Sequence, residues 1–295
     1  MKPTILSVLG SILLSACSIG RGDGFVRGNL ALTQCRQGDA LEAPDFDLGA
    51  EFFFGDPLID FDDSVELRRS SLTIRIQDTS NRLETSDGLM LLLPDLRYAA
   101  RAYADARPLS ADDCFESGGC PTEDYSRVRA KLSLFNSCPD NRSPIVAAPR
   151  DVVRKNVVAA DNCLRSDTVR AACPTLSPAQ LAELDEICAG DLNDANAIQP
   201  RIEAILGQGA ESGSDRVGGP ACLYLCSIGS VQRGDSADAL QTHQFAYDDE
   251  VAGLFFFNVV DGRAITLEQC AASSGQLAGA FRFRLSRNRV AQAFP

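Results

Sequence analysis

The chain has 295 residues and a formal net charge of −12, and it contains 11 cysteines, one histidine and no tryptophan. An acidic chain disfavours nucleic acid as a partner, because phosphates bind clustered Lys and Arg, and it disfavours electrostatic docking to anionic lipid headgroups. The length suits one large domain or two smaller ones.

The first 16 residues have the layout of an export signal. Lys2 supplies a short positive start, and residues 5–14 are apolar apart from small residues. This stretch is too short to cross a bilayer as a helix, which takes roughly 20 residues. Small residues then precede Cys17, as at a cleavage site. A buried helix that happens to end in cysteine is the alternative, but position, length and flanks all favour the signal.

The sequence Leu14-Ser15-Ala16-Cys17 resembles the lipobox of bacterial lipoproteins. The resemblance implies a diacylglyceryl group on the Cys17 thiol, cleavage just before this residue and acylation of the new amino group. It therefore implies a signal peptide over 1–16, a lipid anchor and tether over 17–24, and the membrane as a partner. Ser18, where Asp would signal retention, resembles the pattern of proteins sorted to the outer membrane. No domain family is recognised in the mature chain.

Alternating or continuous apolar patterns predict a first β region over residues 25–160. The predicted strands are residues 25–32, 46–54, 71–77, 88–93 and 128–135. In the third of these, Leu72, Ile74 and Ile76 alternate with polar residues, which indicates a half-buried strand. The continuous apolar run 88–93 indicates a central strand, which Pro94 ends.

A helical, cysteine-rich segment is predicted over 161–220. Ser177, Pro178 and Gln180 form a helix start, with an N-cap, a proline in the first turn and a capping-box residue. Apolar residues then recur at helical spacing up to Gly190. A second apolar face ends at Gly207, so we expect a helical hairpin, followed by a loop over 211–220.

Strand patterns return in the second β region, 221–295. The predicted strands are residues 221–227, 244–247, 251–260 and 276–285. We therefore predict a mainly β fold, an antiparallel β-sandwich or barrel interrupted by a small disulfide-stapled helical insertion. The second β region would complete the same sandwich; two β domains joined through the helices are the alternative.

Cysteine usage points to disulfides. With Cys17 carrying lipid, an even number remains, which in an exported protein indicates bridges. The candidates are Cys35, Cys114, Cys120, Cys138, Cys163, Cys173, Cys188, Cys222, Cys226 and Cys270. Local spacing favours Cys114–Cys120 and Cys173–Cys188. A zinc site is the alternative, but the spacing of Cys222 and Cys226 lacks a second pair or a histidine partner.

Catalytic motifs are missing from the sequence. His243 is the single histidine, and we expect it to be an ordinary surface residue. After Cys17 the sequence has only two lysines, Lys131 on the polar face of a predicted strand and Lys155, so a Ser–Lys dyad is not expected. A triad assembled from distant loops would leave no local signature, so a hydrolase stays open as an alternative.

Acidic loops offer the other chemistry. Asp60, Asp62 and Asp63 are weak candidates for a calcium site, because calcium prefers several oxygen ligands from loops. The alternative is that these acids lie in solvated turns without a metal, and that Asp191 or Asp194 caps a helix. Arg287 and Arg289 are expected to be a charged strand end rather than a recognition patch.

The expected function is that of an envelope lipoprotein, a non-enzymatic binding or structural module without a cofactor. Its expected partners are the membrane, through the lipid, and an unidentified envelope component, and nucleic acid is excluded. A calcium-dependent ligand-binding or adhesion module, with calcium as its cofactor, is the second hypothesis, and the hydrolase is the third.

Overall fold

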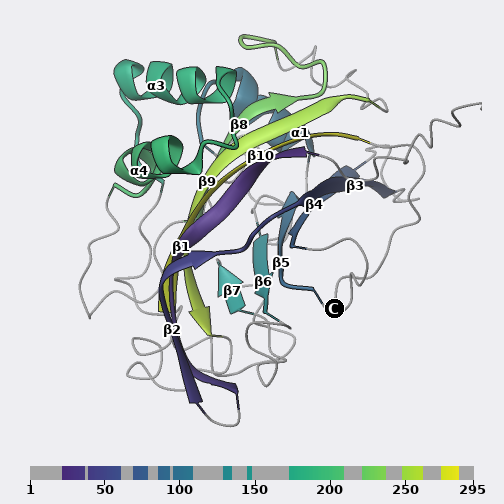
Figure 1. Ribbon diagram of the computed structural model, residues 1–295. Helices are drawn as coiled ribbons and strands as arrows, with labels where there is room; N and C mark the ends of the chain where they lie inside the picture. Colours follow the sequence, from purple (N-terminus) through teal and green to yellow (C-terminus); the bar gives the residue numbers. More distant parts are fainter. Residues whose placement is uncertain are drawn as a thin grey trace, which may run out of the picture.

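The computed structural model describes residues 22–36, 39–60, 69–78, 86–93, 96–108, 129–134, 145–147, 173–208, 221–236, 248–261 and 274–285. Within these ranges the protein has ten strands, all paired antiparallel, and three helices (Figure 1). This confirms the predicted class, a mainly β fold with a small helical insertion.

The strands form one hydrogen-bonded network that divides into two halves of five. The first half runs in the order β2 (Asp39–Asp47), β1 (Gly22–Arg36), β10 (Ser274–Arg284), β9 (Glu250–Asp261) and β8 (Ala221–Ile228). The second runs in the order β3 (Phe52–Asp60), β4 (Arg69–Gln77), β5 (Gly88–Leu93), β6 (Arg129–Ser133) and β7 (Ile145–Ala147).

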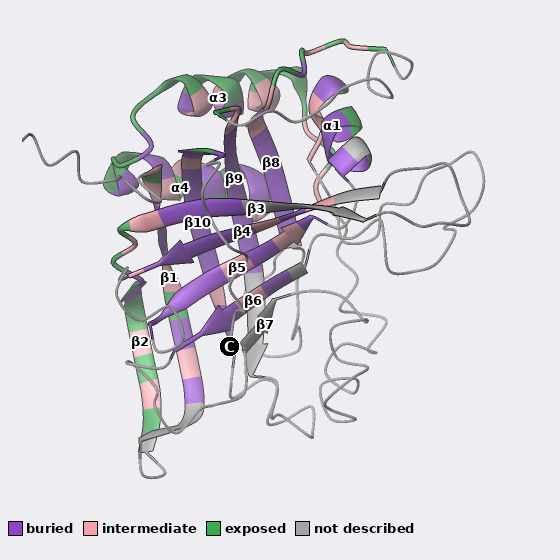
Figure 2. Ribbon diagram, turned by 90° about the vertical axis from the view of Figure 1, so that its right-hand side faces the viewer, coloured by how far each residue is buried: buried purple, intermediate pink, exposed green. Residues whose placement is uncertain are grey.

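Strand β9 joins the two halves. One edge of β9 pairs with β8 between Val251 and Phe257, and the same edge pairs with β7 at Val260 and Asp261. The halves therefore share a corner and fold over each other, so that β3, β4, β5 and β6 cross in front of β1, β10 and β9 (Figure 2). Strands from both sides of the helical segment thus pair within one network, as the interrupted sandwich requires.

The core between the halves is built from the inward faces that sequence alternation predicted. Leu72, Ile74 and Ile76 of β4 are fully buried there, as are Leu89 and Leu91 of β5. From the other half, β10 contributes Leu277, Phe281 and Phe283, and Leu285 follows directly after the strand. Burial of these side chains, each worth about 1.5–3 kcal/mol, is the main driving force for pairing the halves.

The helical hairpin covers the outer face of the first half. Helix α3 (Pro178–Ala189) begins as predicted, because the Ser177 side chain accepts from the Gln180 amide and the Gln180 side chain accepts from the Ser177 amide. Helix α4 (Ala195–Leu206) has Asp194 as its N-cap. The buried helix residues, Leu184, Ile187, Ile198, Ile202, Ile205 and Leu206, pack with outward-facing residues of the sheet such as Phe256.

Helix α1 (Leu96–Ala104) was not predicted. Its buried face consists of Leu96, Tyr98 and four alanines, and Arg101 is exposed. The sequence therefore carries an amphipathic pattern here, but over nine residues only, a length at which a helix depends on tertiary packing. The helix belongs to the core cluster between the halves and lies against β8 and β4. It therefore closes the side of the sandwich where β8 ends.

The single strand predicted over 46–54 is wrong. The chain leaves β2 at Asp47, and β3 starts only at Phe52. The Asp47 carboxylate accepts from the Gly49 amide at 2.9 Å, and Gly49 has a φ of 62°, a conformation that favours glycine. This turn carries the chain from one half of the sandwich to the other.

Strand β4 is also more buried than predicted. Arg75 and Gln77, expected on a solvent-facing side, are 7 % and 1 % exposed. The Arg75 guanidinium lies 6.0 Å from the centre of the Phe54 ring on the neighbouring strand. A buried arginine needs such partners, because leaving its charge uncompensated would cost several kcal/mol.

Candidate functional site

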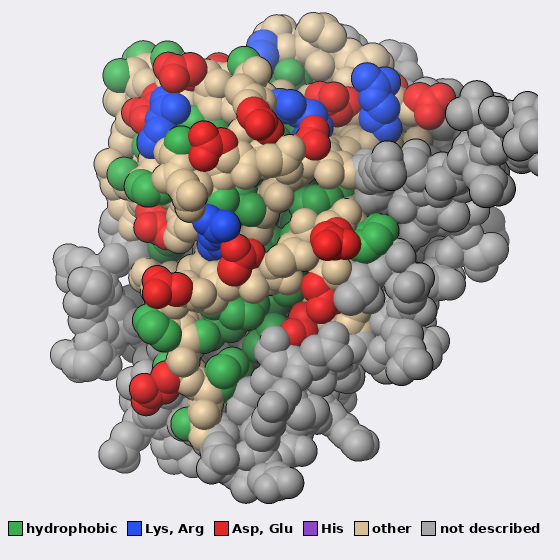
Figure 3. Space-filling view, viewed as in Figure 1, with side chains coloured by type: hydrophobic (Ala, Val, Ile, Leu, Met, Phe, Trp, Pro, Cys, Tyr) green, Lys and Arg blue, Asp and Glu red, His purple; other side chains and the backbone are tan. Residues whose placement is uncertain are grey.

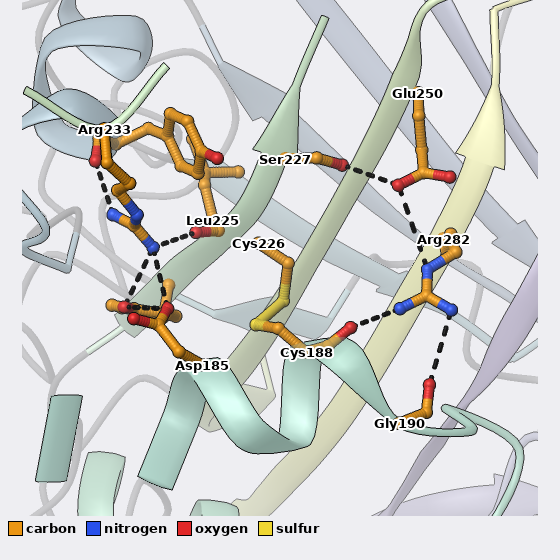
Figure 4. Close-up of a disulfide and its surroundings, with 11 residues drawn as sticks. Asp185, Cys188, Gly190, Leu225, Cys226, Ser227, Arg233, Glu250 and Arg282 are labelled. Carbon is orange, nitrogen blue, oxygen red and sulfur yellow. Dashed lines mark hydrogen bonds and ion pairs between the residues drawn. A yellow bond between two sulfur atoms is a disulfide. The ribbon is translucent and has the colours of Figure 1, made fainter. Parts of the chain in front are cut away.

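A group of polar and cysteine side chains lies where α3 meets β8, β9 and β10 (Figure 4). We call this the junction and define it by the residues labelled in Figure 4 together with Tyr103, Cys173, Cys222 and Tyr224. Its construction begins with β8, because that strand supplies two of the cysteines.

Strand β8 presents Cys222, Tyr224 and Cys226 to the helices. Alternation along a strand places every second residue on the same face, so these three point outward while Leu223 and Leu225 enter the core. A β-bulge follows, in which Leu225 pairs with Gly253, Ser227 pairs with Ala252, and Cys226 is the extra residue. Because of this extra residue, the alternation of side chains between the two faces shifts by one position, and Ile228 points into the core.

Two disulfides fasten the helical segment to this strand. Cys173 is bonded to Cys222, and Cys188 is bonded to Cys226. The pairing of Cys173 with Cys188 that we expected from the sequence is wrong. Cys173 precedes α3 and Cys188 lies in its last turn, and each is bonded to its own partner on β8, with Cα atoms 5.5 and 5.4 Å apart.

Arg233 is held on the other side of the junction. Its guanidinium donates to the Tyr103 carbonyl, to Asp185 at 3.1 Å and to the Leu225 carbonyl at 3.3 Å. The Tyr103 ring centre lies 4.1 Å from the guanidinium carbon, and the Tyr224 ring centre lies 5.1 Å from it. Since Tyr103 belongs to α1, Asp185 to α3 and Tyr224 to β8, this one side chain ties together three elements.

Tyr224 completes that contact. Its ring is buried, and its hydroxyl donates to the Asp185 carboxylate at 2.8 Å and accepts from Arg233 at 2.9 Å. Burial and the hydrogen bond to Asp185 raise the pKa of the phenol well above its usual range, although the charge of Arg233 opposes this shift. The phenol therefore stays protonated and acts as a hydrogen-bond donor.

Arg282 of β10 binds the carboxyl end of α3. It donates to the carbonyls of Cys188 and Gly190, and its Nε lies 4.0 Å from a Glu250 carboxylate oxygen. The Ser227 hydroxyl donates to the same carboxylate at 3.2 Å. A cation suits this position, because the last carbonyls of a helix lack intrahelical donors and carry partial negative charge.

The contacts at the junction hold the helical segment on the sheet. Its two arginines and both acids contact backbone carbonyls or oppositely charged groups inside the protein, and its cysteines are oxidised. Arg233, Tyr224 and Arg282 were not recognised from the sequence. Contacts between residues this far apart in sequence leave no local pattern that could have identified them.

The other residues singled out in the sequence are in part described by the structure and in part outside it. Lys131 lies in the middle of β6, as predicted, and partial burial lowers the pKa of its amine. Asp60 is the last residue of β3, and its side chain is outside the description. The side chain of Cys35 in β1 is likewise not described. Outside the described residues lie Cys17, Asp62, Asp63, Cys114, Cys120, Cys138, Cys163, His243, Cys270, Arg287 and Arg289, and the predicted strand 244–247.

Within the described ranges, Asp, Glu, His and Cys side chains form no group of three or more placed to hold a metal ion. Of the helices that the structure describes, none has both the length and the apolar character to span a bilayer. Comparison with protein-family models, with curated proteins and with solved structures finds no match for this chain.

Proposed function

We propose that this chain is a lipoprotein of the bacterial cell envelope, anchored through Cys17 at the outer membrane, and that it acts as a non-enzymatic binding or structural module. The observation that carries the proposal is the pair of disulfides at the junction. Disulfides persist in oxidising compartments and are rare in the cytosol, which agrees with an export signal over 1–16.

The way in which the junction uses its charged groups supports the non-enzymatic part. Arg233 and Arg282 donate hydrogen bonds to carbonyls and to an acid that position α3, and the Tyr224 phenol stays neutral. Groups used in this way give a rigid domain, which is what a presented binding or structural module needs.

The lipid anchor is tested with the Cys17→Ser variant, and Ser18→Ala serves as the matched control. The wild-type protein and the control should stay with membranes after an alkaline wash and carry the mass of the lipid on the N-terminal peptide. The Cys17→Ser protein should lose both properties. A wild-type peptide without added mass would overturn the anchor.

The binding role is tested by affinity purification of the anchored protein from membranes. A partner that recurs with the wild-type protein and is displaced by an excess of the purified soluble domain would support a binding module. Turnover of a defined substrate by the purified protein would overturn the non-enzymatic assignment.

A further inference from the structure

The described structure begins very close to the proposed lipid. Gly22, the first residue of β1, is five residues after Cys17. A chain spans at most about 3.6 Å per residue, so Gly22 lies within roughly 18 Å of the lipid-bearing Cα. The tether is therefore shorter than the predicted 17–24, because residues 22–24 already belong to β1. It leads directly into an inner strand of the sheet, since β1 is paired on one side with β2 and on the other with β10.

Gly22 lies at one end of the strands in the first half of the sandwich. It pairs with Phe283, Phe283 pairs with Val251, and Val251 pairs with Ile228, so the four residues form one row across the sheet. Beyond this row lie the turn 229–235, residues 248–250 and Arg284. We call Gly22 and these segments the anchor end; in Figure 1 it is the end where β1 and β9 begin and β8 ends.

The anchor end is held together by backbone hydrogen bonds. Gly229 donates to the Glu250 carbonyl at 2.9 Å, and Gly234 donates to the Ala104 carbonyl at 2.9 Å. Asp248 and Leu285 are linked by a further bond of 2.8 Å. The point of attachment is therefore part of a rigid body, and fixing it near a membrane restricts the whole domain.

We propose that the anchor end faces the lipid bilayer and that the β1–β2 hairpin points away from it. The proposal rests on lipidation of Cys17. Strand β1 leads away from Gly22, and the pair Ala31 and Glu42 is nine residues further along β1, which is about 30 Å at the usual rise of a strand.

The flanks of the domain carry more acidic than basic side chains. The exposed acids on α3 and α4 are Asp185, Glu186 and Glu203; Asp185 pairs with Arg233, and Glu186 pairs with Arg201, the single cation of the two helices. Strand β2 contains no cation and exposes Glu42 and Asp45, while its Asp47 pairs with Arg27 of β1 at 2.6 Å. Figure 3 shows Asp and Glu side chains spread over the face that carries the helices, with Lys and Arg side chains among them. Headgroup charges repel such surfaces within about 8 Å at physiological salt. The anchor end also carries more acids than cations, with Asp235, Asp248, Asp249 and Glu250 beside Arg233 and Arg284, so the short tether, and not the charge, selects the end that faces the bilayer.

The absence of tryptophan from the sequence makes the orientation measurable. Ser230→Trp places a fluorophore on the anchor end, and Glu42→Trp places one at the distal row; both positions are exposed. Each full-length lipidated variant is reconstituted into vesicles of phosphatidylcholine and phosphatidylglycerol that contain a lipid with a dansyl headgroup. Energy transfer from tryptophan to dansyl falls with the sixth power of distance.

We expect transfer to be several-fold more efficient from Ser230→Trp than from Glu42→Trp. Inserting a linker of about 20 Gly and Ser residues after Ser18 should reduce this difference, because such a linker behaves as a flexible coil. Equal transfer from both positions, with lipid present on the N-terminal peptide by mass spectrometry, would overturn the orientation alone. A peptide without lipid would overturn the proposed anchor, and with it the orientation.

Discussion

At the residue scale, glycines opposite phenylalanines set how closely β9 and β10 pack. Gly279 pairs directly with Phe255, and Gly253 pairs directly with Phe281. Each ring covers the glycine across from it, and the two rings lie with their centres 6.5 Å apart. Aromatic cover of a glycine in a strand offsets the lost side-chain packing, so these pairs stabilise the most central part of the core.

Replacing Gly279 with alanine should therefore destabilise the fold. A Cβ at this position would lie 2.2 Å from Phe255 Cζ and 2.5 Å from the Phe25 carbonyl oxygen. We expect a loss of about 1–3 kcal/mol in the free energy of unfolding, as for other overpacked cores, measured by chemical denaturation. Gly190→Ala is the control, because its Cβ has no atom nearer than 3.4 Å. Equal losses in the two variants would contradict this account.

Tyr224 gives a pH-dependent contribution at the same scale. Its pKa is raised in the folded protein, so the unfolded phenol ionises first as the pH rises through its ordinary value of about 10. The contribution to stability is complete below that pH and is lost above it. The free energy of unfolding should therefore decline more steeply between about pH 9 and 11 in the wild-type protein than in Tyr224→Phe. Parallel declines would show that the phenol is not the cause.

At the scale of elements, the helical hairpin is attached to the sheet at several points. Its apolar face packs on the outer side of β9 and β10, two disulfides link it to β8, and Arg282 binds the end of α3. The disulfides join residues that are 49 and 38 positions apart in sequence. Links of this span restrict the unfolded chain and typically contribute about 2–4 kcal/mol each.

Peptide mapping without reduction should recover the links Cys173–Cys222 and Cys188–Cys226. In the double variant Cys188→Ser and Cys226→Ser, hydrogen exchange should quicken in α3 much more than in β9 or β10, because the sheet core keeps its packing. A crosslinked peptide joining Cys173 to Cys188 would refute the arrangement, as would equal quickening in the helix and the sheet.

At the scale of the whole molecule, the fold is built from contacts between distant parts of the chain. β1 pairs with β10, and β7 pairs with β9, although roughly 100 residues or more separate the members of each pair. The last three strands complete the first half of the sandwich and hold its corner to the second half. In the proposed orientation, the N-terminal tether would therefore position the complete domain, because β1 is built into this network of distant contacts.

The sequence by itself determined the elements whose information is local. Alternation predicted β4, β6 and β10, a continuous apolar run predicted β5, and the cap at Ser177 predicted the start of α3. It also determined the lipobox resemblance and the expectation of disulfides. The prediction failed at Asp47 and Gly49, where a turn interrupts an aromatic run, and at α1, whose pattern extends over nine residues only.

Only the tertiary structure decided which cysteines meet and what the junction residues contact. Cys173 and Cys188 are near in sequence but lie toward opposite ends of a rigid helix, whereas each is brought to β8 when the hairpin packs on the sheet. The contacts of Arg233 with α1, α3 and β8 likewise exist only after those elements have docked. The physical reason is the same in each case: spacing along the chain governs hydrogen bonding within an element, whereas packing of apolar faces determines which elements become neighbours.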